Sequence, residues 1–208
     1  MRRLKYLAIN NGKSILMALL LAFVMGNLIG IIADADEISK EFVRFHIVAN
    51  SNSEKDQEIK WKVREAIFHE MDLSSIHSKE SAIDFFRLQK DRLEAIANQV
   101  LSEHDFSYQC CVSVGKKWFP VREYSDFVLP AGVYDAVSVT LGQGKGENFF
   151  CVMYPSLCMI EGVTEQTASN REVMNCVLSE EEISTITGNK KKLVIQFKIV
   201  EIIQEILS

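Results

Sequence analysis

The chain has 208 residues, with 23 Lys or Arg side chains, 28 Asp or Glu side chains and a formal net charge of −5. This acidic balance argues against nucleic acid as a partner, because phosphate backbones are bound by clustered Lys and Arg. No linker rich in Pro, Gly or Ser divides the sequence after its first segment, so residues 36–208 are expected to form a single domain.

Residues 1–35 have the composition of an export helix. An uncharged stretch from Ser14 to Ala33 is long enough, at about 1.5 Å per residue, to cross a hydrocarbon layer of roughly 30 Å. Basic residues precede it, which keeps the N-terminus in the cytoplasm and delivers the rest across the membrane: Arg2, Arg3, Lys5 and Lys13. The segment is either a signal peptide cleaved near Ala33-Asp34-Ala35 or an uncleaved membrane anchor.

The next elements are predicted to be a strand and a helix. Apolar residues alternate over 42–49 and the run ends at a polar turn, 50–53, which is typical of a strand. Ser53 is a suitable helix cap, and the apolar residues that follow it recur on one helical face as far as Met71. That face is expected to belong to the core.

A second helix is predicted from its cap at Ser78 to Val100, where apolar residues are spaced by threes, fours or sevens. The period then changes to two. Strands are expected at 108–114, ending at Gly115, and at 133–141 and 149–154, with the last two joined as a hairpin through a glycine-rich tip at 142–148.

The C-terminal region is predicted to contain a short helix and a last strand. Ser179 and Glu182 fit a capping box, and Gly188 fits a left-handed helix end. Residues 193–199 alternate and favour a strand over a continuous helix, so Lys190-Lys191-Lys192 is interpreted as a solvated turn before it. The element order predicts an α+β domain, with an antiparallel or mixed sheet carrying helices on one face, preceded by the export helix.

The sequence offers little sign of catalysis. It lacks the zinc-protease and nucleophile-elbow motifs, and its four histidines, His46, His69, His77 and His104, lack metal-ligand spacing. Gly144-Lys145 suggests a phosphate loop, but Gly146 stands where Ser or Thr would bind magnesium and a strand follows where a helix should. We therefore expect no enzyme activity and no cofactor.

Five cysteines leave at least one outside any intrachain disulfide. Cys151 on a predicted strand and Cys158 after the bend at Tyr154-Pro155-Ser156 could come within bridging distance in an oxidising compartment. A disulfide between them and two packed thiols are both compatible with the sequence.

Three segments together resemble the stage II sporulation protein R family of endospore-forming bacteria. The first is Arg44-Phe45-His46-Ile47-Val48-Ala49-Asn50-Ser51 with Asp56-Gln57 and Lys62-Val63-Arg64. The second comprises Phe119-Pro120-Val121-Arg122-Glu123-Tyr124, Leu129-Pro130-Ala131-Gly132-Val133-Tyr134, Gly142-Gln143-Gly144-Lys145-Gly146-Glu147-Asn148 and the run from Cys151 to Cys158. The third surrounds Phe197-Lys198-Ile199-Val200-Glu201. Phe149-Phe150 stands where the family commonly has two tryptophans, a conservative change in bulk.

The resemblance implies a signalling role. Such proteins are made in the forespore, cross its membrane into the intermembrane space, and activate a membrane-embedded aspartic-type protease that removes the pro-sequence of a sigma factor. The chain would then be an activator, secreted or anchored by a single pass, with that protease and the membrane as partners.

Candidate receptor-contact positions are taken from the segments that carry the resemblance: Arg44, His46, Asn50, Ser51, Phe119, Pro120, Arg122, Tyr124, Leu129, Pro130, Gly132, Tyr134, Gly142, Gly144, Lys145, Gly146, Glu147 and Asn148. Their turn residues and aromatics motivate the choice. Two other functions compete with this one: an exported envelope hydrolase that uses acidic residues, and a purely structural envelope module.

Overall fold

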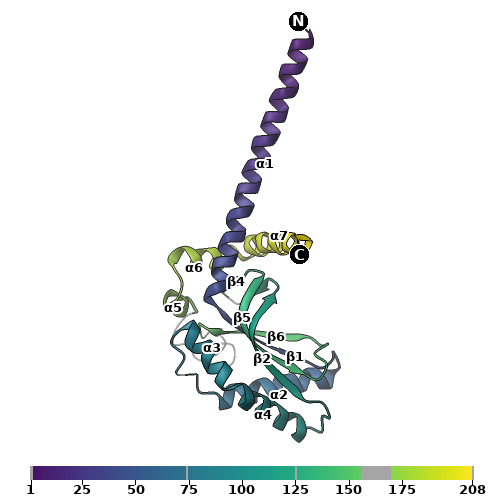
Figure 1. The fold of residues 1–208 in the computed structure, drawn as a ribbon, viewed down its shortest axis with the longest axis vertical. Helices are drawn as coiled ribbons and strands as arrows, with labels where there is room; N and C mark the ends of the chain where they lie inside the picture. The colour runs from purple at the N-terminus through teal and green to yellow at the C-terminus, as the bar shows by residue number, and fades with distance from the viewer. Residues whose placement is uncertain (1, 74, 125, 156–169, 208) are drawn as a thin grey trace.

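The structure is a computed structural model that describes residues 2–73, 75–124, 126–155 and 170–207. It has an α+β fold with a long N-terminal helix standing out from the domain (Figure 1), which confirms the predicted class. The helices are α1 (Arg2–Glu41), α2 (Glu54–Glu70), α3 (Lys79–Leu88), α4 (Lys90–Glu103), α5 (Asn170–Asn175), α6 (Glu180–Thr187) and α7 (Lys190–Leu207). The strands are β1 (Val43–Val48), β2 (Cys110–Phe119), β3 (Arg122–Glu123), β4 (Val128–Leu129), β5 (Gly132–Leu141) and β6 (Asn148–Tyr154).

The main sheet is mixed, as expected, with strand order β2-β5-β1-β6, while β3 and β4 form a separate small pair. β1 runs parallel to β5 and antiparallel to β6, and β2 runs antiparallel to β5. The predicted hairpin is therefore wrong: β1 lies between β5 and β6, and residues 142–147 cross over its end. Alternation of apolar residues indicates the two faces of a strand but not which strands are neighbours.

One face of the sheet is covered by α2, α3 and α4. Val43, Phe45 and Ile47 of β1 pack there with Ile59 and Val63 of α2. The side chain of Ser53 accepts a hydrogen bond from the backbone N–H of Asp56, so the predicted cap of α2 is confirmed.

Two expectations on this side were wrong. The helix predicted over 78–100 is broken at Gln89 into α3 and α4. The sequence does not reveal the break, because Phe86 and Leu93 on its two sides are seven residues apart and both face the core. β2 does not end at Gly115, which pairs with Ala136. It continues to Phe119 because β5 is ten residues long and pairs with it over its whole length.

The opposite face is covered by the C-terminal turns of α1 together with α5 and α6. Tyr134 and Ala136 of β5 pack there with Ile38 of α1, Met174 of α5 and Ile183 of α6. The capping box of Ser179 and Glu182 is confirmed. Gly188 is not left-handed, since its φ is −64° and its ψ is −154°.

Residues 193–199 form part of helix α7, so the predicted last strand is wrong. Leu193, Phe197 and Val200 are buried, at spacings of four and three, while Ile195 and Ile199 are exposed. The same residues contain a period-two pattern and a helical pattern, and the helical pattern is the one that the domain buries.

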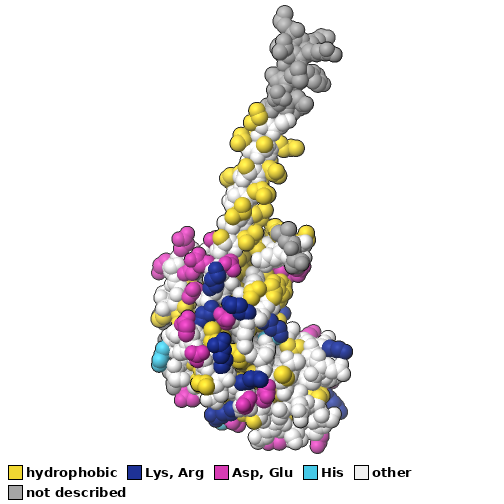
Figure 2. Space-filling view, viewed as in Figure 1, with side chains coloured by type: hydrophobic (Ala, Val, Ile, Leu, Met, Phe, Trp, Pro, Cys, Tyr) yellow, Lys and Arg dark blue, Asp and Glu magenta, His cyan; other side chains and the backbone are white. Residues whose placement is uncertain are grey.

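Helix α1 is continuous from its apolar segment into the core. Ser14–Glu41 is long and apolar enough to cross a membrane, and Figure 2 shows apolar side chains along the shaft with charged side chains gathered on the domain. Ala35, Ile38 and Phe42 have exposures of at most 1%. Because proteases act on exposed, open chain, the predicted cleavage position at Ala35 is accessible only before the domain folds.

Candidate functional site

Residues 142–147, here called the crossover loop, lie over the C-terminal end of β1. The backbone N–H of Gly146 donates to the carbonyl of Ala49 at 2.8 Å, and that of Lys145 donates to the carbonyl of Asn50 at 3.1 Å. The side-chain oxygen of Asn50 accepts from the N–H of Gln143 at 2.9 Å. The loop is therefore attached to β1 through its backbone, which leaves its side chains free to face solvent.

The crossover loop requires glycine at specific places. Gly142 and Gly144 have φ values of +56° and +60°, in the left-handed region that favours glycine. Gly146 has an ordinary φ, but a Cβ there would collide with the carbonyl oxygen of Ser51. Two of these glycines thus serve the dihedrals expected of them, and the third serves close approach.

Asp56 anchors the turn between β1 and α2. Its carboxylate accepts hydrogen bonds from Ser51 Oγ at 2.5 Å, Asn50 Nδ2 at 3.0 Å and Tyr108 Oη at 2.5 Å. Burial acts to raise the pKa of Asp56, but the hydrogen bonds from Ser51, Tyr108, Asn50 and Ser53 outweigh it and the pKa is lowered. Asp56 and Tyr108 were not among the predicted site residues, although Asp56 lies in the first segment that carries the family resemblance.

Arg44 lies on the other face of the sheet from α2, inside a box of aromatic rings. Its guanidinium carbon is 4.6 Å from the ring centre of Phe119, 4.9 Å from that of Tyr134 and 5.8 Å from that of Tyr124. Its Nη2 donates to the hydroxyl of Tyr124 at 3.1 Å. The side chain has 0% exposure, and its Nε and Nη1 have no hydrogen-bond partner in the part of the chain that the structure describes.

His46, two residues further along β1, joins β5 to β6. Its Nε2 is 2.6 Å from Ser138 Oγ, and its Nδ1 is 3.2 Å from Asn148 Oδ1. Burial, with the nearby Lys117 and Arg44, lowers the pKa of His46 to about 4, so the ring is neutral at pH 7. Since Asn148 Oδ1 can only accept, Nδ1–H donates to it and Nε2 accepts from Ser138.

The predicted positions divide into buried and exposed sets. Fully or largely buried are Arg44, His46, Phe119, Leu129, Pro130 and Tyr134. Asn50, Ser51, Pro120, Tyr124, Gly132, Gly142, Gly144 and Gly146 are partly buried. Arg122, Lys145, Glu147 and Asn148 are exposed. Most of the segments that carry the family resemblance thus hold the fold together, and only four of the positions offer side chains to a partner.

Two members of the exposed set, Arg122 and Asn148, are linked by one series of contacts. The guanidinium carbon of Arg122 lies 3.9 Å from the ring centre of Phe150. The ring centre of Phe150 is 6.0 Å from that of His46, which is hydrogen-bonded to Asn148. Asn148 follows Glu147 at the end of the crossover loop. Two positions more than 20 residues apart are therefore connected through these rings, and Glu147 lies beside Lys60 of α2, whose Nζ donates to its carbonyl. The four exposed positions, Arg122, Lys145, Glu147 and Asn148, are called the signature surface below.

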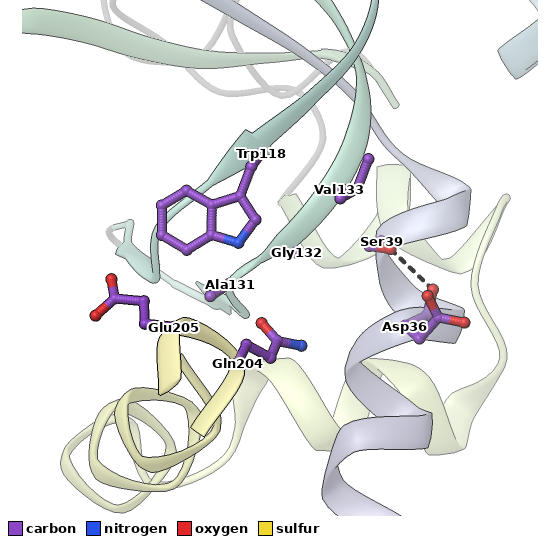
Figure 3. Close-up of a pocket in the computed structure, with 8 residues that line it drawn as sticks. All are labelled: Asp36, Ser39, Trp118, Ala131, Gly132, Val133, Gln204 and Glu205. Carbon is purple, nitrogen blue, oxygen red and sulfur yellow. Dashed lines mark hydrogen bonds between the residues drawn. The ribbon is translucent and has the colours of Figure 1, made fainter. Parts of the chain in front are cut away.

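Leu129 pairs with Arg122 across β3 and β4, whereas Gly132 lies near Ser39 of α1. Gly132 lines a pocket of about 510 Å³ between β2, β5, α1 and the end of α7 (Figure 3). Its walls carry the carboxylates of Asp36 and Glu205 and the exposed ring of Trp118. No group of three or more metal-ligating side chains occurs among the residues described.

Cys151 is disulfide-bonded, whereas Cys110 and Cys111 are free thiols. Its predicted partner, Cys158, lies outside the described residues, so that pairing stays a prediction. Cys110 is buried, and burial together with Glu94 raises the pKa of its thiol to about 12.

Asp56→Asn is expected to lower the free energy of unfolding at pH 7 by about 2 kcal/mol, because it removes charge-assisted hydrogen bonds. The native pKa of Asp56 lies below its unfolded value of about 3.9, so its contribution is present above pH 4 and is lost as the pH falls through the native pKa. Urea unfolding of the full chain in detergent should show a smaller acid-dependent loss in the variant. An unchanged pH profile contradicts this role; Asp84→Asn, on exposed α3, is the control.

Arg44→Met should keep the free energy of unfolding within about 1 kcal/mol of the parent or raise it, because it removes a buried charge while conserving bulk. Arg44→Ala should lower it by about 2–4 kcal/mol through the cavity left between the rings. The same urea titration measures both. If the Met variant is destabilised as much as the Ala variant, the guanidinium itself stabilises the domain.

Comparison with known proteins gives consistent matches. The family model described as stage II sporulation protein R matches residues 39–164. A curated relative, the stage II sporulation protein R of Bacillus subtilis (strain 168), is 32% identical over 187 residues, which cover 82% of this chain and 84% of that protein. No solved structure matches the chain. The matched residues span the aromatic box, the His46 contacts and the crossover loop. The chain belongs to the stage II sporulation protein R family.

Proposed function

We propose that this chain is an exported sporulation signal, made in the forespore, that acts across the intercellular space on a membrane-embedded aspartic-type protease and switches on its processing of a pro-sigma factor. Family membership supports a role in sporulation. The apolar α1 supports export or anchoring. The observation that carries the proposal is the signature surface: two segments that are distant in sequence, β3 and residues 145–148, expose charged and polar side chains along the β6 side of the sheet.

An activator must discriminate between two states of its receptor. A ligand shifts an equilibrium only through the difference in its affinity for the two states, and a difference of about 1.4 kcal/mol gives a factor of ten. The signature surface suits this task because its supports are already hydrogen-bonded in the free protein. Little ordering free energy is then lost on binding, which leaves more of the contact energy to favour the active protease.

The chain has positions for a matched test of the signature surface. Replacing Arg122, Lys145 and Glu147 together by alanine removes two cations and one anion from that surface. Replacing Arg87, Arg92 and Glu103 by alanine removes the same number of cations and anions from exposed positions of α3 and α4, on the other face of the sheet. In cells that make the protease and its substrate, the first variant should reduce pro-sequence removal at least tenfold, whereas the second should leave it unchanged.

Both triple variants should fold cooperatively, since the crossover loop is held through its backbone. The first should lose only about 1 kcal/mol of stability, because Arg122 also stacks on Phe150. Equal processing by the two variants would place the receptor contact elsewhere on the chain. If both folded variants lose processing to the same extent, the cause is a general effect of charge. That result would also contradict the proposed role of the signature surface.

An exported envelope hydrolase remains the second candidate, because Ser138, His46 and Asn148 are arranged like a nucleophile, a base and an orienting group. Ser138 is only 2% exposed, so its hydroxyl is closed to a substrate in this conformation. The signalling proposal requires these residues only to join three strands.

Ser138→Ala separates the two candidates. If the protein is a signal, the folded variant should still support pro-sequence removal at the parent level. Its free energy of unfolding should fall by about 1–3 kcal/mol, because Nε2 of His46 loses its hydrogen-bond partner. A hydrolase predicts loss of activity in protein that remains folded. Ser113→Ala, on exposed β2 of the same sheet face, is the control.

A further inference from the structure

Helix α7 has two apolar faces, and the domain uses only one. Leu193 and Phe197 pack against Val121, Val128 and Ala131 next to the β3–β4 pair. Four isoleucines lie on the opposite side of the helix with exposures from 44% to 77%: Ile195, Ile199, Ile202 and Ile206. Their spacing of four, three and four makes one continuous stripe. A contiguous exposed apolar stripe on a protein surface marks an interaction site.

The place of α7 indicates what this stripe meets. α7 lies crosswise to α1 at the end of the domain from which the apolar shaft emerges (Figure 1). Ile31 of α1, within the uncharged stretch from Ser14 to Ala33, packs on the same cluster as Val194 of α7. If α1 crosses the bilayer along its normal, α7 lies in the plane of the bilayer, at the depth where the apolar segment of α1 ends.

The stripe faces the lipid side in this arrangement. Because Leu193 and Phe197 point into the domain, the isoleucines on the other side of the helix point away from it, toward the N-terminal end of α1. The exposed cations Lys191 and Lys198 flank the stripe on one side and Lys192 flanks it on the other, by helical spacing. Lysines at the borders of an apolar face reach the headgroups of an interfacial helix, as their flexible side chains allow.

At the same end of the domain, β2 and β5 also expose residues of the kind found at membrane interfaces. Trp118 and Val133 are exposed by 42% and 51%, and Figure 3 shows them across a pocket from Gln204 and Glu205 of α7. Tryptophan is enriched at the level of the headgroups. Apolar exposure on the domain is thus found next to α1 on both α7 and the β2–β5 edge.

We infer that α7 is an interfacial helix that lies on the outer surface of the membrane crossed by α1, with its isoleucine stripe among the acyl chains and its lysines at anionic headgroups. The occupant is the lipid bilayer, because the adjoining spanning helix holds the stripe against that surface. The signature surface would then be presented at a fixed height and orientation above the membrane. The inference rests on α1 as an anchor and does not require the proposed receptor.

The test uses the full chain at one copy per lipid nanodisc, without any other protein, and measures quenching of tryptophan by brominated lipids. Trp61→Phe and Trp118→Phe remove the native fluorophores. Ile202→Trp then reports on the stripe, and Glu103→Trp, at the end of α4, is the matched control on an exposed site of the domain. We expect Trp at 202 to be quenched at least threefold more strongly than Trp at 103 and to emit at shorter wavelength.

Thermal unfolding that matches the parent shows that each reporter protein is folded. Water-like, unquenched emission from position 202 overturns the inference, and this is also the result expected if a receptor or a second copy covers the stripe instead. Equal quenching at 202 and 103 overturns it as well, since the domain would then lie on the membrane by another face. The nanodisc contains no protease, so failure here leaves the proposed signalling function unaffected.

Discussion

The central position of β1 is the constraint on which the rest of the domain depends. With β5 on one side and β6 on the other, its six residues are all buried, and the connection from β5 to β6 has to cross its end. That crossing places the loop glycines against Ala49 and Asn50 and aligns Ser138, His46 and Asn148 across three strands. Arg44, which points to the same face of β1 as His46, is enclosed by the rings of Phe119, Tyr134 and Tyr124.

The residues predicted the individual elements better than their pairing. Ser53 and Ser179 identified helix starts, because a cap is a local hydrogen bond that sequence spacing reveals. The order of strands depends on contacts between distant residues, so adjacent alternating runs were mistaken for a hairpin. In α7, Ile195 and Ile199 completed a strand-like alternation because they are apolar. They are nevertheless exposed, and a sequence pattern cannot show which apolar residues a domain buries.

The candidate site was also only partly accessible from the sequence. The family resemblance led to segments whose residues, such as Gly146 and Tyr134, mostly support the fold. Asp56 was missed as the centre of a network because three of its partners come from segments before and after its own helix. The exposed residues that remain form a small charged surface, and β1 connects this part of the domain to α1, which is apolar enough to cross a membrane.

We propose that the signature surface touches the protease, and photo-crosslinking tests this most directly. A photoreactive amino acid in place of Lys145 should give a covalent adduct with the protease in cells that make both proteins. The same group in place of Leu88, which is 84% exposed on α3, should give none. Adducts from position 88 but not from position 145 would contradict the account.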